Sequence, residues 1–153
     1  MGVYQLVRIQ TFQQPIETLW DFISDPRNLK KITPEYMGFD ITSKNLSDRM
    51  YQGMIIKYKV SPLLGIKTTW ITEITHVKLN EYFVDEQRVG PYKLWHHQHF
   101  LRTTPEGTEM EDIVTYQPPF GILGSFTNKL IIEKKLNEIF DHRHAKLIEI
   151  FGK

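Results

Sequence analysis

Between residues 37 and 116 the chain alternates short runs of β-branched and aromatic residues with turn-forming residues. Such runs favour strands, whereas glycine, proline and asparagine at the breaks favour turns. Because consecutive strands joined by turns pair in antiparallel fashion, this region predicts a β-meander. The predicted strands span residues 39–44, 54–60, 66–76, 82–88, 93–102 and 108–116.

The two ends of the chain add a strand and helices to this meander. A strand predicted at residues 3–11 is followed by two short helices, the first opened by Pro15 and the second ended by Pro34. An apolar stripe then predicts a helix over residues 123–151, and about 28 helical residues span roughly 42 Å. This order predicts an α+β fold in which a curved antiparallel sheet of about seven strands surrounds the long C-terminal helix.

Length and composition restrict the classes of function that the chain can have. A chain of 153 residues has the size of one domain, and we expect residues 1–153 to form it. The net charge of +1 offers no basic field for nucleic acid, and the absence of cysteine excludes disulfides, thiol nucleophiles and cysteine-bound metals. Since residues 1–6 lack the layout of a signal peptide and no apolar run reaches about 20 residues, we expect a cytoplasmic protein without a membrane span.

The predicted strand at residues 93–102 has an unusual composition. Side chains alternate between the two faces of a strand, so Trp95, His97 and His99 share one face and His96 lies on the other. A face with one large aromatic ring and two imidazoles is too polar for an ordinary core and too aromatic for an ordinary surface. It suits the wall of a pocket that holds a ligand.

The hairpin that follows gives this face an opposing strand. If residues 104–107 form a four-residue loop, the paired residues are Thr103–Thr108, Leu101–Met110, His99–Asp112, His97–Val114 and Trp95–Tyr116. The Cβ atoms of opposed residues lie about 5 Å apart. The carboxylate of Asp112 would then favour the charged form of His99 and fix the orientation of its ring.

The preceding hairpin can be treated in the same way. If residues 77–80 form its loop, the paired residues are Ile74–Phe83, Thr72–Asp85 and Trp70–Gln87. These side chains also make one mixed apolar and polar face. We expect both hairpins to turn these faces toward the same side of the sheet, although a slip of one residue would invert either assignment.

These residues resemble one family over nearly the whole chain. The matching patterns are Pro15-x-Glu17-x-Leu19-Trp20-x-Phe22, Leu29-x-x-Ile32-Thr33-Pro34, Trp70-x-Thr72-x-Ile74, Phe83-x-Asp85-x-Gln87, Gly90-Pro91-Tyr92-x-x-Trp95-x-His97-x-His99, Gly107-Thr108-x-Met110-x-Asp112-x-Val114-x-Tyr116-x-Pro118 and Leu136-x-x-Ile139-Phe140-x-x-Arg143. Their order and spacing resemble the bacterial ligand-binding branch of the SRPBCC superfamily. This superfamily includes the START, polyketide-cyclase and plant pathogenesis-related proteins.

The resemblance implies a helix-grip fold, in which the sheet and the C-terminal helix enclose a cavity. It also implies that the cavity binds a small hydrophobic molecule, without naming that molecule. The candidate ligand-binding residues are Met54, Trp70, Thr72, Asp85, Trp95, His97, His99, Met110, Asp112, Tyr116 and Arg143.

Several interpretations of these polar residues stay open. His97 and His99 have a spacing that metal sites use, with Asp112 or Asp85 as a third ligand, but we expect neither a metal nor a cofactor. The His–Asp pair could instead orient a ligand, or only tie two strands together by a hydrogen bond. Arg143 either extends along the apolar surface toward solvent or pairs with an anionic group of the ligand.

The main hypothesis is therefore a binding protein that carries or sequesters a small apolar molecule with one polar end. A cyclase-like or aromatase-like enzyme that uses the His–Asp pair is the first alternative, although no residue is assigned as catalytic. The second alternative is a dimeric interaction module, because exposed strand edges can pair. The sequence allows either a monomer or a homodimer.

Overall fold

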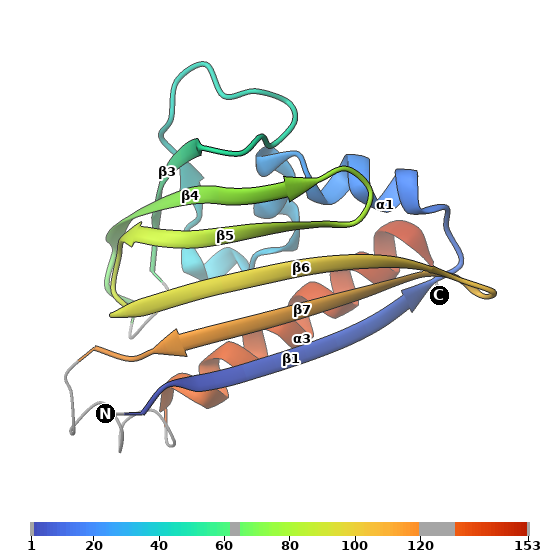
Figure 1. The fold of residues 1–153 in the computed structure, drawn as a ribbon. Helices are drawn as coiled ribbons and strands as arrows, with labels where there is room; N and C mark the ends of the chain where they lie inside the picture. Colours follow the sequence, from blue (N-terminus) through green and yellow to red (C-terminus); the bar gives the residue numbers. More distant parts are fainter. Residues whose placement is uncertain (1, 62–64, 120–130, 153) are drawn as a thin grey trace.

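The fold was analysed in a computed structural model that describes residues 2–61, 65–119 and 131–152. Seven antiparallel strands form one sheet in the order β1-β7-β6-β5-β4-β3-β2. The helix α3 lies across the face of this sheet at the β1, β7 and β6 end (Figure 1). The elements are β1 Tyr4–Phe12, α1 Ile16–Ile23, the 3-10 helices η1 Pro26–Ile32 and η2 Glu35–Met37, β2 Asp40–Ile41, β3 Met54–Val60, β4 Thr68–Lys78, β5 Tyr82–Val89, β6 Leu94–Thr104, β7 Gly107–Gln117 and α3 Glu133–Phe151.

The predicted helix-grip architecture is confirmed, with a few differences in the elements. The strand predicted at residues 39–44 is only two residues long. The second short helix is a 3-10 helix that begins at Pro26, where Asp25 accepts a hydrogen bond from the backbone N–H of Arg27 at 3.0 Å. The first part of the predicted helix over residues 123–151 falls mostly outside the described residues, and α3 begins at Glu133.

The predicted register of the β6–β7 hairpin is confirmed at every pair. Thr103 pairs with Thr108, His99 with Asp112 and Trp95 with Tyr116. Gly107 makes the tight loop possible, because its φ of 132° is a conformation that side chains with a Cβ atom rarely adopt. This register places Asp112 beside the two histidines of β6.

The predicted register of the β4–β5 hairpin is wrong, although the face assignment holds. Ile74 pairs with Asp85 and Thr72 with Gln87, which is a shift of two residues. The loop between Lys78 and Tyr82 is shorter than predicted, and an irregularity between Ile74 and His76 adds a residue to β4. Because the shift is even in this part of the strands, the same side chains still face the interior.

Two clusters of buried apolar side chains lie between the sheet and the helices. Strand β3 alternates between buried and exposed residues along its whole length, as expected when one face packs on the core and the other contacts water. Helix α3 contributes Leu136, Ile139, Phe140 and Leu147 to these clusters. A hydrogen bond from Gln14 Nε2 to the carbonyl oxygen of Phe151, at 3.0 Å, connects the end of α3 to the segment before α1.

None of the helices in the described part of the chain combines the length and apolar character that a membrane span requires.

Candidate functional site

A cavity of about 140 Å³ lies between the sheet, the η1 region and α3. Its volume is comparable to that of an engineered cavity of roughly 150 Å³ in another protein, which binds benzene. Most of its wall is apolar, and the sheet supplies a group of large aromatic side chains. These are Tyr58, Trp70, Phe83, Tyr92 and Trp95.

The aromatic side chains hold one another in place. The rings of Trp70 and Trp95 meet edge to face, with their centroids 5.3 Å apart, and Tyr92 packs against Trp95 at 4.9 Å. Tyr58 stacks on Trp70 at 6.1 Å, and its hydroxyl is hydrogen-bonded to Thr72 Oγ1 at 3.0 Å. Such pairs contribute about 0.5–1.5 kcal/mol each beyond the area they bury, so this part of the wall is preorganised.

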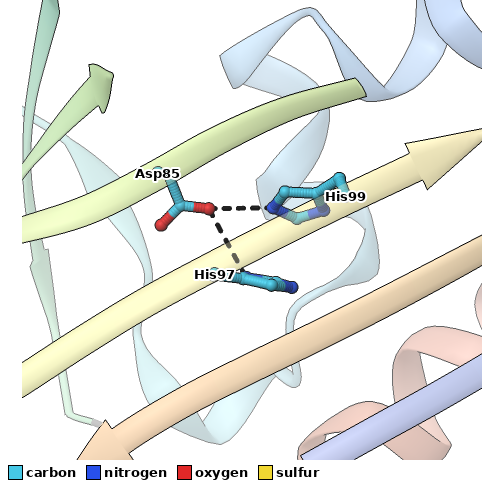
Figure 2. Close-up of side chains that lie close together, drawn as sticks. All are labelled: Asp85, His97 and His99. Atoms are coloured by element: carbon cyan, nitrogen blue, oxygen red, sulfur yellow. Dashed lines mark hydrogen bonds and ion pairs between the residues drawn. The ribbon is translucent and has the colours of Figure 1, made fainter. Parts of the chain in front are cut away.

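Four polar side chains meet in the wall of the same cavity. One oxygen of Asp112 faces both imidazoles, at 3.0 Å from His97 Nε2 and 2.8 Å from His99 Nδ1. One oxygen of Asp85 faces the other nitrogens, at 2.8 Å from His99 Nε2 and 3.4 Å from His97 Nδ1 (Figure 2). The two rings lie side by side, with their centroids 3.7 Å apart. We call Asp85, His97, His99 and Asp112 the His–Asp cluster.

Burial and neighbouring charge give the two histidines of the cluster opposite pKa shifts. Burial, and then the nearby charge of His99, lower the pKa of His97 to about 4, although His97 also contacts both carboxylates. Burial opposes the charge of His99 as well, but its hydrogen bonds with Asp112 and Asp85 outweigh that effect and raise its pKa. The pKa of His99 therefore lies above that of His97, so His99 is the ring that takes up a proton first as the pH falls, and His97 is neutral at neutral pH.

The two carboxylates of the cluster stay ionised. Burial alone would raise the pKa of Asp112, but its hydrogen bonds with His97 and His99 hold that pKa well below its usual value. Asp85 shows the same balance: burial is outweighed by the charge that His97 carries once it is protonated, at about pH 4, and by the hydrogen bond with His99, and both lower the pKa of Asp85. Since neutral His97 donates from one nitrogen only, the shorter contact assigns that proton to Nε2, facing Asp112.

Two other cavity-lining residues carry buried N–H groups without a partner. Among the described residues, neither Trp70 Nε1 nor Arg143 Nε has a hydrogen-bond acceptor. The Arg143 guanidinium lies 4.6 Å from the centre of the Phe140 ring, which is a cation–π contact. A buried donor without a partner costs about 1–3 kcal/mol, so a ligand that supplies an acceptor there would be favoured.

Most of the residues predicted for the site line the cavity. They are Trp70, Asp85, Trp95, His97, His99, Met110, Asp112 and Arg143. The other three do not line it. Met54 is buried in the core and only 2% exposed. The hydroxyl of Thr72 is hydrogen-bonded to that of Tyr58, and Tyr116 packs against Tyr4 and Tyr92.

Several lining residues were not predicted. Tyr58 could have been found, because it lies four residues after Met54 and therefore shares its face of β3. The apolar residues of α1 and η1, such as Phe22 and Leu29, carry no sequence signal that distinguishes a cavity wall from an ordinary core. His96 lies on the outer face, as predicted, where it contacts Glu86 at 2.9 Å.

Comparisons with known proteins identify a family and a fold. The family model described as "Domain of unknown function (DUF8410)" matches residues 13–151. None of the curated proteins gives a significant match to the sequence.

Solved structures resemble this one over almost their full length. The protein CV1439 from Chromobacterium violaceum has a TM-score of 0.71 at 15% identity, covering 97% of this chain and 98% of that chain. TTHA0849 from Thermus thermophilus has a TM-score of 0.63 at 14% identity, with coverages of 97% and 99%. Ara h 8.0201 has a TM-score of 0.60 at 14% identity, with the same coverages. At these identities the similarity establishes the helix-grip fold alone.

Proposed function

The chain belongs to the DUF8410 family, and because that description names no ligand, we propose a function from the site itself. Residues 1–153 act as one domain that binds a small apolar molecule with a polar end inside the cavity between the sheet and α3. The observation that carries this proposal is the position of the His–Asp cluster in the wall of a mostly apolar cavity rich in aromatic side chains. A few placed polar groups within apolar walls are typical of ligand sites.

The size and chemistry of the cavity define the ligand further. A volume of about 140 Å³ suits a molecule with one ring or an equivalent aliphatic group. Arg143 and Trp70 offer hydrogen-bond donors, whereas the facing oxygens of Asp85 and Asp112 already contact the two imidazoles. The polar end is therefore an acceptor, such as a carboxylate or a carbonyl group.

Native mass spectrometry of the protein purified from its own host tests this proposal directly. We expect a small organic molecule that stays bound in the native spectrum and is released on denaturation. Purified His99→Ala should bind the identified molecule more weakly, because it removes the imidazole that contacts both Asp85 and Asp112 at 2.8 Å in the cavity wall. His96→Ala is the matched control: it changes the same residue type on the same strand but on the outer face. Equal affinities of the two variants would contradict the proposal.

A second function is favoured by one observation, the pairing of two imidazoles with opposite pKa shifts. The pKa of His99 is raised and that of His97 is about 4, so an imidazole that holds a proton more readily lies beside one that releases it more readily in the cavity wall. This pair could move protons in a cyclisation or dehydration of the polyketide type. If His99→Ala keeps its affinity for a candidate polyketide but abolishes turnover, the protein is an enzyme rather than a carrier.

A further inference from the structure

We propose that Asp85, His97 and His99 bind a divalent first-row transition metal such as Zn²⁺ or Fe²⁺, with Asp112 orienting both imidazoles from behind. The proposal does not depend on the proposed function, because it concerns the metal alone. It rests on the positions of the ligand atoms, on the hydrogen bonds behind them and on the balance of charge.

The ligand atoms converge on one point. One atom from each of Asp85, His97 and His99 lies within 4.8 Å of the other two. Metal–ligand distances of about 2.0–2.2 Å separate neighbouring ligand atoms by about 3.0 Å at right angles and about 3.4 Å in a tetrahedron. The Asp85 oxygen lies 2.8 Å from His99 Nε2 and 3.4 Å from His97 Nδ1, so both separations fall close to these values (Figure 2).

Asp112 supplies the hydrogen bonds that a pair of metal-binding histidines requires. A histidine bound to a metal through one nitrogen usually donates its other N–H to a carboxylate or carbonyl group, which fixes the tautomer and the ring. The outer nitrogens here are His97 Nε2 and His99 Nδ1, at 3.0 Å and 2.8 Å from the same Asp112 oxygen. An ordinary His–Asp hydrogen bond that ties two strands together needs one carboxylate. The second carboxylate, on the opposite side of both rings, supplies the anionic ligand that a metal ion between Asp85 and the two imidazoles would need.

Charge and exposure favour the Asp85 side of the rings as the metal position. The charges of Asp85 and Asp112 offset those of a divalent metal held by two neutral imidazoles, and Arg143, which also lowers the pKa of Asp85, adds one positive charge nearby. The side chain of Asp85 is 16% exposed and that of Asp112 only 4%, so the Asp85 side has more room for additional ligands. Two imidazoles and one carboxylate leave further coordination positions, an arrangement that suits Fe²⁺ and Zn²⁺.

A titration of the chelator-treated, full-length protein with Co²⁺ alone tests the proposal. We expect one Co²⁺ per chain, visible absorption bands of a bound ion, and displacement of Co²⁺ by Zn²⁺. Asp85→Asn should abolish this binding, because it removes the anionic ligand at nearly unchanged volume. Asp112→Asn should weaken binding about 10–100-fold while the absorption bands persist. His96→Ala, which removes the outer His–Glu contact, should bind Co²⁺ like the wild type.

Far-ultraviolet circular dichroism should accompany each titration as the check that each variant is folded. A second measurement uses the wild type alone and needs no variant. The proton NMR spectrum of the Co²⁺ form should show two strongly shifted, exchangeable imidazole N–H signals, one each from His97 and His99. Absence of these signals, Co²⁺ binding that persists in Asp85→Asn, or Co²⁺ binding that is lost in His96→Ala would overturn the proposal. Because no organic ligand is present, such a failure leaves the proposed binding function standing.

Discussion

At the scale of single residues, replacing Asp112 tests how much the His–Asp cluster contributes to the stability of the fold. It is 3% exposed and accepts hydrogen bonds from both imidazoles. Removing one partner from a buried charge pair costs about 3–5 kcal/mol, so Asp112→Asn should lower the free energy of unfolding of the metal-free protein by about 3 kcal/mol at neutral pH. Urea denaturation measures this change. Glu109→Gln, which breaks a surface contact with Arg102, should cost less than about 1 kcal/mol.

The effect of Asp112→Asn on the free energy of unfolding should depend on pH. The folded-state pKa of Asp112 is depressed, so its contribution is full above the unfolded pKa of about 3.9 and is lost as the pH falls toward the folded pKa. The pKa of His99 is raised, so its contribution is full below about 6.5 and is lost as the pH rises through the folded pKa.

The stability difference between wild type and Asp112→Asn should therefore be largest at about pH 5–6 and decline on both sides. Urea denaturation at a series of pH values measures this profile. A difference that is constant with pH would show that Asp112 acts by its shape rather than its charge.

Part of the cluster could be predicted from the sequence. The pairing of His99 with Asp112 follows from the length of one hairpin loop, and the structure has that pairing. The contact of Asp85 with both histidines could not be predicted, because it depends on the pairing of β5 with β6 across the Gly90-Pro91 turn. The diagonal contact of His97 with Asp112 depends on side-chain rotamers, which strand periodicity does not specify.

At the scale of elements, the β6–β7 turn should be sensitive to a single added methyl group. A Cβ atom at Gly107 would lie 2.1 Å from the backbone oxygen of Phe12, and the φ of 132° adds strain. Gly107→Ala should therefore lower the free energy of unfolding by more than about 2 kcal/mol. Gly53→Ala is the control, since its φ is 88° but no atom lies within 4 Å of the added Cβ. It should cost only about 1–2 kcal/mol.

Chemical denaturation compares these two variants. Equal losses would mean that backbone conformation, and not the approach of β1 to the turn, sets the requirement for glycine. A larger loss for Gly107→Ala would confirm that this turn fixes the β1 end of the sheet against β7, the strand that carries Asp112.

Elements were predicted well where local chemistry decides them and poorly where it does not. Strand β3 keeps its predicted bounds, and its buried and exposed residues alternate without interruption. The β4–β5 hairpin differs because a bulge near Thr75 and the positive φ of Asn80, 59°, alter the pairing. A bulge leaves no mark in a sequence of β-branched residues, so the predicted pairing was shifted.

At the scale of the whole molecule, the order of elements was enough to predict the helix-grip fold, but the shape of the cavity was not predictable. Met54, Thr72 and Tyr116 lie on the predicted face, yet neighbouring side chains enclose them and they do not reach the cavity. The opposite wall comes from α1, η1 and α3, which do not adjoin the cavity-lining strands in the sequence. Its residues are selected by packing between elements rather than by a local pattern.

A ligand that enters this cavity should stabilise the folded protein. Binding to the folded state alone adds about 2.7 kcal/mol when the ligand concentration is 100 times Kd. For a chain of this size, each kcal/mol raises Tm by about 2–4 °C. Thermal unfolding in the presence of each compound should therefore show larger increases in Tm for benzyl alcohol and benzoate, which carry an oxygen, than for toluene. Equal increases in Tm for all three compounds would contradict a polar end held by the donors of Arg143 and Trp70.

The most direct test of ligand binding in the cavity uses the tryptophan side chains as reporters. Trp70 and Trp95 line the cavity, whereas Trp20 does not. In a titration with benzoate followed by ¹H–¹⁵N NMR, the indole N–H signals of Trp70 and Trp95 should shift in a saturable manner and that of Trp20 should move least. Signals that stay in place for benzoate, benzyl alcohol and toluene alike, or that shift equally for all three tryptophans, would contradict binding in this cavity.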